Sequence, residues 1–245
     1  MSVTPTNDVV MTGPVAGAGD VQAAETFRVF VGYDSREDIA YRVCRRSLLQ
    51  RSSVPVAVIP IVQQELRSAG LYWRERGPTE STEFSFTRFL TPHLAGYRGW
   101  ALFVDCDFLF VADVAELARM ADPRYAVLCV HHDYAPKEAT KMDGAVQTVY
   151  PRKNWSSMVP FVWNFLVGHN RVDPADTAGT APRAIHYTSG GPWFEQYKNC
   201  EFAELWVQER DAYEAEAEED EEKEEHEPKA ILHAPAAPSA VPVDA

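Results

Sequence analysis

The chain has 245 residues, of which 46% are hydrophobic and 11% aromatic, so it is long enough to bury one core and has a globular composition. The formal net charge is −13, but most of the excess lies between Glu209 and Lys229, where twelve acidic residues stand against three basic ones. The remainder is mildly acidic and contains no basic patch, which argues against a nucleic-acid partner.

In chain order, strand-like runs alternate with runs of helical spacing from residue 27 to residue 132. Strands are expected at 27–33, 54–62, 100–110 and 125–132. Helices are expected at 38–51, 82–94 and 113–120. This alternation predicts an α/β fold with a mostly parallel central sheet and flanking helices. The continuous apolar runs fit strands that are buried on both faces.

The two ends of the chain differ from this middle part. Residues 1–25 are rich in small residues without periodicity and predict a flexible N-terminal tail. Residues 214–245 are first acidic and then rich in Ala and Pro, which predicts a disordered tail. The acidic block is interpreted as a solvated tail or a fraying helix extension, and the alternative is a specific partner-binding role. A single domain is therefore expected over 26–213.

The cysteines and the apolar runs bear on location. Cys44, Cys106, Cys129 and Cys200 are widely spaced and form no CxxC or zinc pattern, so buried free thiols are expected. No stretch reaches the ~18 apolar residues of a membrane span, and the N-terminal sequence lacks the pattern of a signal peptide. We therefore expect no integral membrane segment and a cytoplasmic location.

Two aspartates, Asp105 and Asp107, lie near the end of the apolar run GWALFVDCDFLF (99–110). Because residues two apart on a strand point to the same side, both carboxylates can converge while Cys106 faces the core. Converging carboxylates repel each other and require a counter-charge. A hard divalent cation such as Mn²⁺ or Mg²⁺ would supply it. Ligands of parallel sheets collect at this end of the strands, where Asp34 also lies.

The D-x-D spacing alone has other interpretations. One aspartate could cap a turn. An aspartyl-phosphate phosphohydrolase also places D-x-D after a strand, but there the pair usually opens the domain, whereas here it is in mid-chain and is followed by Phe108-Leu109-Phe110. A nucleotidyltransferase would need a first loop rich in Gly, Lys and Arg, and GYDSRED is a poor match.

Four segments occur in an informative order: VFVGYDSREDIAYR (29–42), ESTEFSFTRFLTPHLAGYRGWALFVDCDFLFVADVAEL (80–117), WNFLVG (163–168) and HYTSGGPWF (186–194). Together they resemble nucleotide-sugar-dependent glycosyltransferases of the GT-A fold, and most closely the family-8, galactosyltransferase-like group. The resemblance covers roughly residues 27–207.

The resemblance implies transfer of a sugar from a nucleotide-diphosphate donor, a UDP-sugar, to an unknown carbohydrate, lipid or protein acceptor, with retention of the anomeric configuration. Asp105, Asp107 and His186 would hold Mn²⁺ or Mg²⁺ against the diphosphate. Arg88 would add a second positive group beside them, so the expected catalytic residues are Asp105, Asp107 and Arg88. The alternative for Arg88 is a structural role.

The same resemblance implies further ligand-binding residues. These are Gly32, Tyr33 and Asp34 around the nucleoside, Lys153 toward the sugar or acceptor, and Gly190 and Gly191 after the metal-binding histidine. Glycine permits close backbone approach, and a tyrosine ring can stack on a base. Tyr33 could instead belong to the core, and Asp34 could form the Asx turn that ends its strand.

The sequence departs from the family pattern at two places. Gly191 occupies the position where the family usually has a lysine that contacts the diphosphate. KNWSSM (153–158) is followed almost at once by VPFVWNF (159–165), whereas relatives carry a few dozen residues there, including a strand. We therefore expect a truncation near 158–160. The alternative function is a non-catalytic relative that binds a nucleotide sugar or a protein partner.

Overall fold

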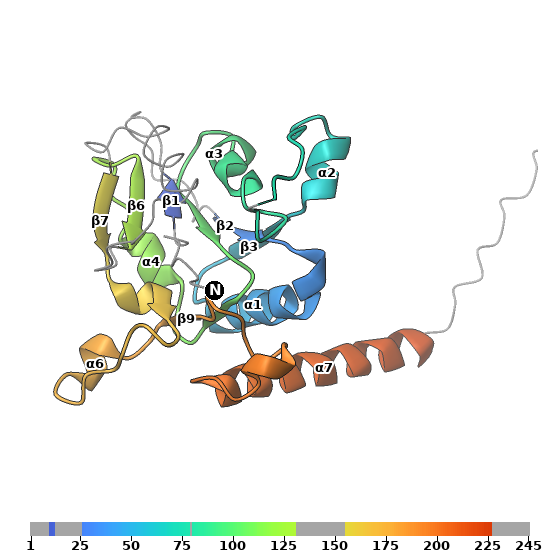
Figure 1. Cartoon of the computed structure of the whole chain (residues 1–245), viewed down its shortest axis with the longest axis vertical. Helices are drawn as coiled ribbons and strands as arrows, with labels where there is room; N and C mark the ends of the chain where they lie inside the picture. The colour runs from blue at the N-terminus through green and yellow to red at the C-terminus, as the bar shows by residue number, and fades with distance from the viewer. Residues whose placement is uncertain (1–9, 13–25, 79, 131–154, 227–245) are drawn as a thin grey trace, which may run out of the picture.

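The fold surrounds two β-sheets with helices (Figure 1). The structure, a computed structural model, describes residues 10–12, 26–78, 80–130 and 155–226. Within these ranges the strands form one sheet of six strands and one of three. The fold class is therefore α/β, as predicted.

The larger sheet has the strand order β3-β2-β4-β1-β6-β7. Its strands are β1 (Val10–Thr12), β2 (Phe27–Gly32), β3 (Val56–Ile61), β4 (Ala101–Val104), β6 (Val127–Val130) and β7 (Trp155–Val159). β2 pairs in parallel with both β3 and β4, and β6 pairs in parallel with β7. The side chains of β4 and nearly all of those of β2 are buried, because this part of the sheet is covered on both faces.

One strand of this sheet comes from the segment that was expected to be a flexible tail. β1 lies between β4 and β6 and runs antiparallel to both. Its backbone groups thus join two sets of parallel strands, which satisfies polar groups that a central strand must pair. Three residues are too few for a periodicity signal, so the prediction for residues 10–12 is wrong. The rest of 1–25 lies outside the described residues.

The apolar run at 100–110 forms two strands rather than one. β4 ends at Val104, and β5 (Phe108–Phe110) belongs to the smaller sheet. That sheet has the order β5-β9-β8, with β8 at Phe165–Leu166 and β9 at Ala184–His186. Asp105, Cys106 and Asp107 therefore form the crossing between the two sheets. The prediction of a continuous strand is wrong because each half finds a different pairing partner.

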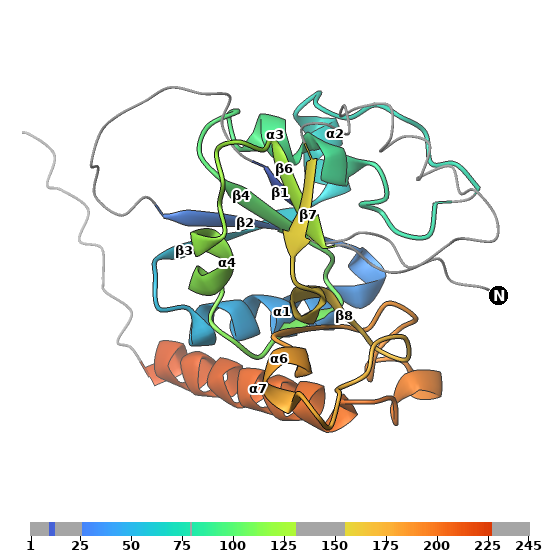
Figure 2. The ribbon, with the colours of Figure 1, turned by 90° about the vertical axis from the view of Figure 1, so that its left-hand side faces the viewer.

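Helices lie on both sides of the larger sheet (Figures 1 and 2), with α1 and then α7 on one side and α2 and α3 on the other. The α-helices are α1 (Asp38–Arg51), α2 (Gln63–Ser68), α3 (Thr91–Leu94), α4 (Ala115–Arg119), α6 (Thr177–Thr180) and α7 (Ala203–His226). Single 3₁₀ turns occur at η1 (Ser35–Glu37), η2 (Thr87–Leu90), η4 (Phe161–Asn164) and η5 (Glu195–Tyr197).

The helix expected over 82–94 is broken into turns, η2 and α3. Pro92 stands in the first turn of α3, where its missing N–H costs nothing. The same proline would disrupt the interior of a continuous helix. The prediction of one helix is therefore wrong.

The acidic block is helical as far as His226. The interpretation as a helix extension is therefore confirmed, and the prediction of disorder from residue 214 is wrong for 214–226. Arg46 of α1 pairs with Glu216 of α7 at 2.6 Å, which ties the acidic part of α7 to the domain. The residues from 227 onward lie outside the described part.

The four cysteines are free, as predicted; Cys44, Cys106 and Cys129 are buried, and Cys200 is half-buried. Burial raises the pKa of Cys44 and Cys106 well above its ordinary value, which keeps both thiols protonated and unreactive. Within the described ranges, no helix combines the length and the apolar character that a membrane span requires.

Candidate metal and ligand site

A cavity opens where β2 and β4 end and the chain crosses to the smaller sheet. This is the carboxyl end of parallel strands, where ligands of open α/β sheets bind. The residues that line it come from four separate segments of the chain: Glu37, Ser81, Thr82, Phe84, Arg88, Asp105, Cys106, Asp107, His186 and Thr188. Four of the predicted site residues, Arg88, Asp105, Asp107 and His186, are among them.

The three predicted metal ligands come together at this cavity. Asp105, Asp107 and His186 each offer one ligand atom, and these atoms all lie within 4.8 Å of one another. The smaller sheet sets this arrangement, because His186 of β9 pairs with Phe108 of β5, the residue directly after Asp107. The ring of Phe108 also stacks on the imidazole, with centroids 4.3 Å apart. The backbone N–H of Tyr187 donates to the carbonyl of Asp107 at 3.0 Å and holds the crossing in place.

Asn164 determines how the imidazole of His186 is presented. Both side chains are buried, and Oδ1 of Asn164 lies 2.8 Å from Nδ1 of His186. Because a carbonyl oxygen can only accept, Nδ1 carries the proton, and in the neutral imidazole Nε2 carries the lone pair. Nε2 lies 3.3 Å from Oδ1 of Asp107. That buried oxygen accepts no hydrogen bond from the described residues. Two electron-pair donors that face each other fit a bound cation.

Arg88 supplies positive charge on the other side of the pair. Its guanidinium lies 3.2 Å from the carboxylate of Asp105 and sits over the rings of Phe84 and Phe103, 5.2 and 5.3 Å from their centroids. It extends from η2 rather than from the helix expected there. The aromatic contacts fix the guanidinium plane, so Arg88 both supports Asp105 and borders the cavity.

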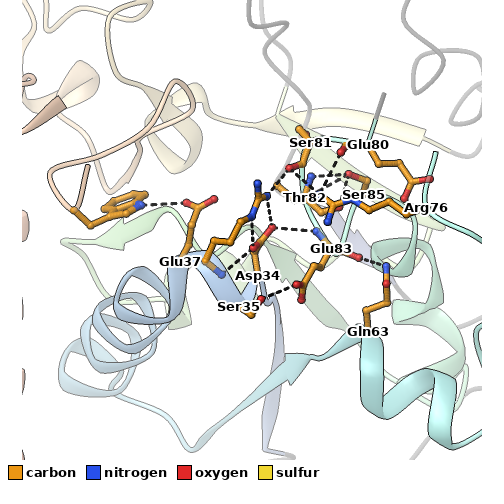
Figure 3. A network of polar contacts seen from close by, with 12 residues as sticks. Asp34, Ser35, Glu37, Gln63, Arg76, Glu80, Ser81, Thr82, Glu83 and Ser85 are labelled. Atoms are coloured by element: carbon orange, nitrogen blue, oxygen red, sulfur yellow. Dashed lines mark hydrogen bonds and ion pairs between the residues drawn. The ribbon is translucent and has the colours of Figure 1, made fainter. Parts of the chain in front are cut away.

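Asp34 is buried in a network of its own (Figure 3). Its carboxylate accepts bonds from the backbone N–H, Nε and Nη2 of Arg36, and from the backbone N–H of Glu83 at 3.1 Å. Burial alone would raise the pKa of Asp34, but these bonds outweigh it and hold the pKa below its ordinary value. Asp34 thus holds segment 81–85 against the end of β2 by hydrogen bonds. It is not among the residues that line the cavity. The Asx turn that was the alternative interpretation is present, because the backbone N–H of Arg36 donates to Oδ1 of Asp34.

Gly32 and Tyr33 also lie outside the cavity lining. A Cβ on Gly32 would stand 2.4 Å from the ring of Phe84, so the packing of that ring requires glycine at this position. The hydroxyl of Tyr33 donates to Asp38 at 2.9 Å, and its ring packs edge-on against Tyr41 with centroids 5.4 Å apart. In this structure both residues serve packing.

Gly190 and Gly191 are explained by packing as well. Gly190 has a φ of +112°, and a Cβ there would lie 2.5 Å from the ring of Tyr197. A Cβ on Gly191 would lie 2.0 Å from the ring of Trp193. The two glycines therefore permit the turn after His186 that seats Trp193. The remaining predicted ligand-binding residue, Lys153, lies outside the described residues.

The cavity contains one acid that the sequence interpretation missed. Glu37 ends η1 and directly precedes α1, but its side chain does not cap that helix. Instead Oε2 accepts a hydrogen bond from Nε1 of Trp193 at 3.2 Å. Burial, then the charges of Asp107 and Asp34, raise the pKa of Glu37 to about 7. The available signal was its place three residues after Asp34, at the start of a predicted helix.

Fold and site together define an α/β protein with a cluster of two acids and a histidine, of which Asp105 and His186 are buried and Asp107 is half-buried, at the carboxyl ends of parallel strands. The sequence is 56% identical over 229 residues to Protein CDI of Arabidopsis thaliana. The aligned region covers 78% of this chain and 88% of Protein CDI. The chain therefore belongs to the same family as Protein CDI. No protein-family model matches it. The alignment is 229 positions long, but it includes only 78% of the 245 residues of this chain, which is fewer than 229. Part of the relative's aligned stretch therefore has no counterpart in this chain.

Proposed function

We propose that this protein is a metal-dependent glycosyltransferase of the GT-A, nucleotide-diphospho-sugar transferase-like type. It would move a sugar from a nucleoside-diphosphate donor, a UDP-sugar, to a carbohydrate, lipid or protein acceptor. The observation that carries the proposal is the convergence of Asp105, Asp107 and His186 within 4.8 Å, in a cavity at the carboxyl ends of parallel strands. The resemblance of the motifs to the family-8 group adds the donor class and the retention of anomeric configuration.

The donor set suits Mn²⁺ or Mg²⁺. Carboxylate oxygens are the preferred ligands of both ions, and an imidazole nitrogen is more compatible with Mn²⁺. The hydrogen bond from His186 to Asn164 leaves Nε2 as the ligand atom, which is the usual function of an outer partner of a metal-bound histidine. When bound, the ion stabilises negative charge on the departing diphosphate as a Lewis acid.

Other residues of the cavity would bind and orient the donor. The guanidinium of Arg88 matches the geometry of phosphate oxygens and is held in a fixed plane by two phenylalanine rings. Three residues that line the cavity, Ser81, Thr82 and Thr188, carry hydroxyl groups, a type of group that can donate to phosphate or sugar oxygens.

A second candidate is a non-catalytic protein that binds a nucleotide sugar, or a protein partner, without transfer. The observation in its favour is that part of the relative's aligned stretch has no counterpart in this chain. The predicted truncation near 158–160 falls beside WNFLVG, in the half of the fold that would hold the acceptor. In that case the cavity would retain its ligand but lack the second substrate.

Calorimetric titration with UDP tests the proposal, in Mn²⁺ and again in EDTA. We expect the wild type to bind UDP in Mn²⁺ and to lose this binding in EDTA. Asp107→Asn should weaken the Mn²⁺-dependent binding by at least thirtyfold. Asp113→Asn is the matched control, because Asp113 bonds Ser53 and the N-terminus of α4 away from the cavity. It should bind as the wild type does.

Two results would contradict the proposal: equal binding of UDP in Mn²⁺ and EDTA, or Asp107→Asn that binds as tightly as the wild type. Hydrolysis of UDP-glucose and UDP-galactose in Mn²⁺ then separates the two candidates. Release of free sugar supports the transferase, and metal-dependent binding without any release supports the non-catalytic binder.

A further inference from the structure

Glu37 borders the cavity, and its side chain caps no helix. It lies half-buried at the wall of the cavity, beside the buried Asp34 (Figure 3). As the residue before α1 it could cap the helix, yet its side chain makes no capping bond. The carboxylate is directed instead to Trp193 of the C-terminal motif.

The hydrogen bond that Glu37 accepts from Trp193 could be accepted equally by a neutral side chain. Trp193 donates one hydrogen bond to Oε2, and the amide oxygen of a glutamine could accept the same bond. Among the described residues, no lysine or arginine forms an ion pair with Glu37. The neighbouring Arg36 is held by both oxygens of Asp34, at 2.9 and 2.7 Å.

A charge in this position has a cost. The burial of Glu37 and the negative charges of Asp107 and Asp34 both oppose its ionisation, as its pKa of about 7 reflects. A half-buried acid that forms no ion pair among the described residues, on the wall of a cavity, is an arrangement typical of ligand-binding sites. A ligand with hydroxyl groups would supply the donors that the protein leaves out.

The chemistry of the acid and its location indicate the kind of donor. Carboxylates that lie beside the carboxyl ends of strands in nucleotide-binding α/β folds accept bonds from sugar hydroxyls. Asp34 is the acid that the sequence suggested for such a function, but four hydrogen bonds within the protein engage its carboxylate. Glu37 is the acid at this end of β2 that borders the cavity.

We propose that Glu37 accepts a hydrogen bond from a sugar-ring hydroxyl of the nucleotide ligand in this cavity. The inference rests on the proposed function, since it assumes a nucleotide sugar as the ligand. The hydroxyl belongs either to the ribose or to the transferred sugar. Both present the same donor chemistry, and Trp193 holds the carboxylate in place for either one.

Titration with analogues tests Glu37 and distinguishes the two sources. The wild type, Glu37→Gln and Glu37→Ala are titrated in Mn²⁺ with UDP, its 2′-deoxy analogue, UDP-glucose and UDP-galactose. If the ribose is the partner, the wild type binds UDP about tenfold more tightly than the deoxy analogue. If the transferred sugar is the partner, it binds one UDP-sugar about tenfold more tightly than UDP. In either case the difference shrinks to about threefold in Glu37→Gln and vanishes in Glu37→Ala, because a charged acceptor bonds more strongly than a neutral one.

Glu83→Gln is the matched control. Glu83 lies on the segment clasped by Asp34, and its carboxylate accepts a bond from Ser35 outside the cavity lining. Glu83→Gln should show the same difference in affinity between the compared ligands as the wild type does. Thermal unfolding, measured for each variant beside the titrations, shows whether the variant is folded. Metal-dependent binding of UDP or one of its analogues by a variant shows that its binding site is intact.

The outcomes separate failure of this inference from failure of the proposed function. If the wild type binds none of the four ligands in Mn²⁺, the proposed function falls and the assignment of Glu37 falls with it. If the wild type binds UDP but the Glu37 variants change all four affinities alike, or none of them, the assignment of Glu37 is overturned while the proposed function stands.

Discussion

Acidic side chains are buried in two regions of this molecule, and the two regions differ in how many cationic side chains pair with those acids. Between α1 and α7, Glu209 is 5% exposed, and each of its carboxylate oxygens pairs with an arginine, Arg46 or Arg51. At the cavity, Asp105 is 6% exposed and is joined by Asp107, with an arginine on one side and a histidine on the other.

The balance of charge differs between the two regions. Glu209 has two cations for one acid. Among the described residues that line the cavity, the three acids Glu37, Asp105 and Asp107 have one cationic side chain beside them, that of Arg88, because His186 is a neutral imidazole. Paired charges at a helix interface hold the fold together, whereas an excess of one sign in a cavity costs stability and gains affinity for a ligand of opposite charge. The comparison therefore separates structural acids from functional acids.

The largest expected effect on stability lies in the α1–α7 interface. Glu209→Ala should lower the free energy of unfolding by about 3 kcal/mol, because it leaves two arginines without their buried partner. Urea unfolding measures this change. Glu204→Ala, at an exposed acid on the first turn of α7, is the control and should change it by less than about 0.5 kcal/mol. Equal effects of the two substitutions would remove Glu209 from the structural side of the comparison.

The next effect concerns the histidine of the cavity. Asn164→Ala removes the acceptor of Nδ1 of His186, so the imidazole loses its fixed tautomer and orientation. We expect Mn²⁺ binding, followed by electron paramagnetic resonance, to weaken by roughly ten- to hundredfold. Asn164→Asp retains an acceptor and should stay within a few-fold of the wild type. If both variants lose Mn²⁺ equally, Asn164 acts through packing alone.

The smallest effect is a pH dependence of stability that arises from Glu37. Its pKa is raised in the folded state to about 7, from 4.5, so the folded state binds the proton more tightly than the unfolded state. Burial, Asp107 and Asp34 raise this pKa, while the bond from Trp193 and the charge of Arg36 lower it. The folded state is therefore destabilised as the pH rises from 4.5 through 7.

Glu37→Gln should escape this destabilisation. Measured by urea unfolding without divalent cation, its stability advantage over the wild type should be about 2 kcal/mol larger at pH 8 than at pH 5. The variant would thus be more stable and less able to bind ligand, as expected of a functional acid. An advantage that is the same at both pH values would place Glu37 with the structural acids.

Much of the fold could be predicted from the sequence, because its signals are local. The strands β2, β3 and β6 and the helix α1 were expected from the periodicity of apolar residues over several turns or pleats. The helix expected over 82–94 failed at Pro92, whose effect depends on which turn it enters. β1 was missed because a three-residue strand is defined by its neighbours in the sheet and carries no periodic signal of its own.

Some residues of the candidate site could likewise be predicted from local sequence, and others could not. The residue types of Asp105, Asp107 and His186 limit what chemistry they can perform, and the sequence already contained their spacing and order. The nucleoside-binding set around Asp34 could not be evaluated in this way, because its carboxylate is engaged by Arg36 and by a backbone N–H from a segment nearly fifty residues away.

The sequence by itself determined the α/β class, the acids of the crossing and the histidine that could join them, since these depend on side-chain chemistry and local spacing. Only the tertiary structure decided that the crossing joins two sheets, that Asp34 is used up within the protein and that Glu37 borders the cavity. The physical reason is that the availability of a carboxylate depends on which donors surround it, and those donors come from segments that only folding brings together.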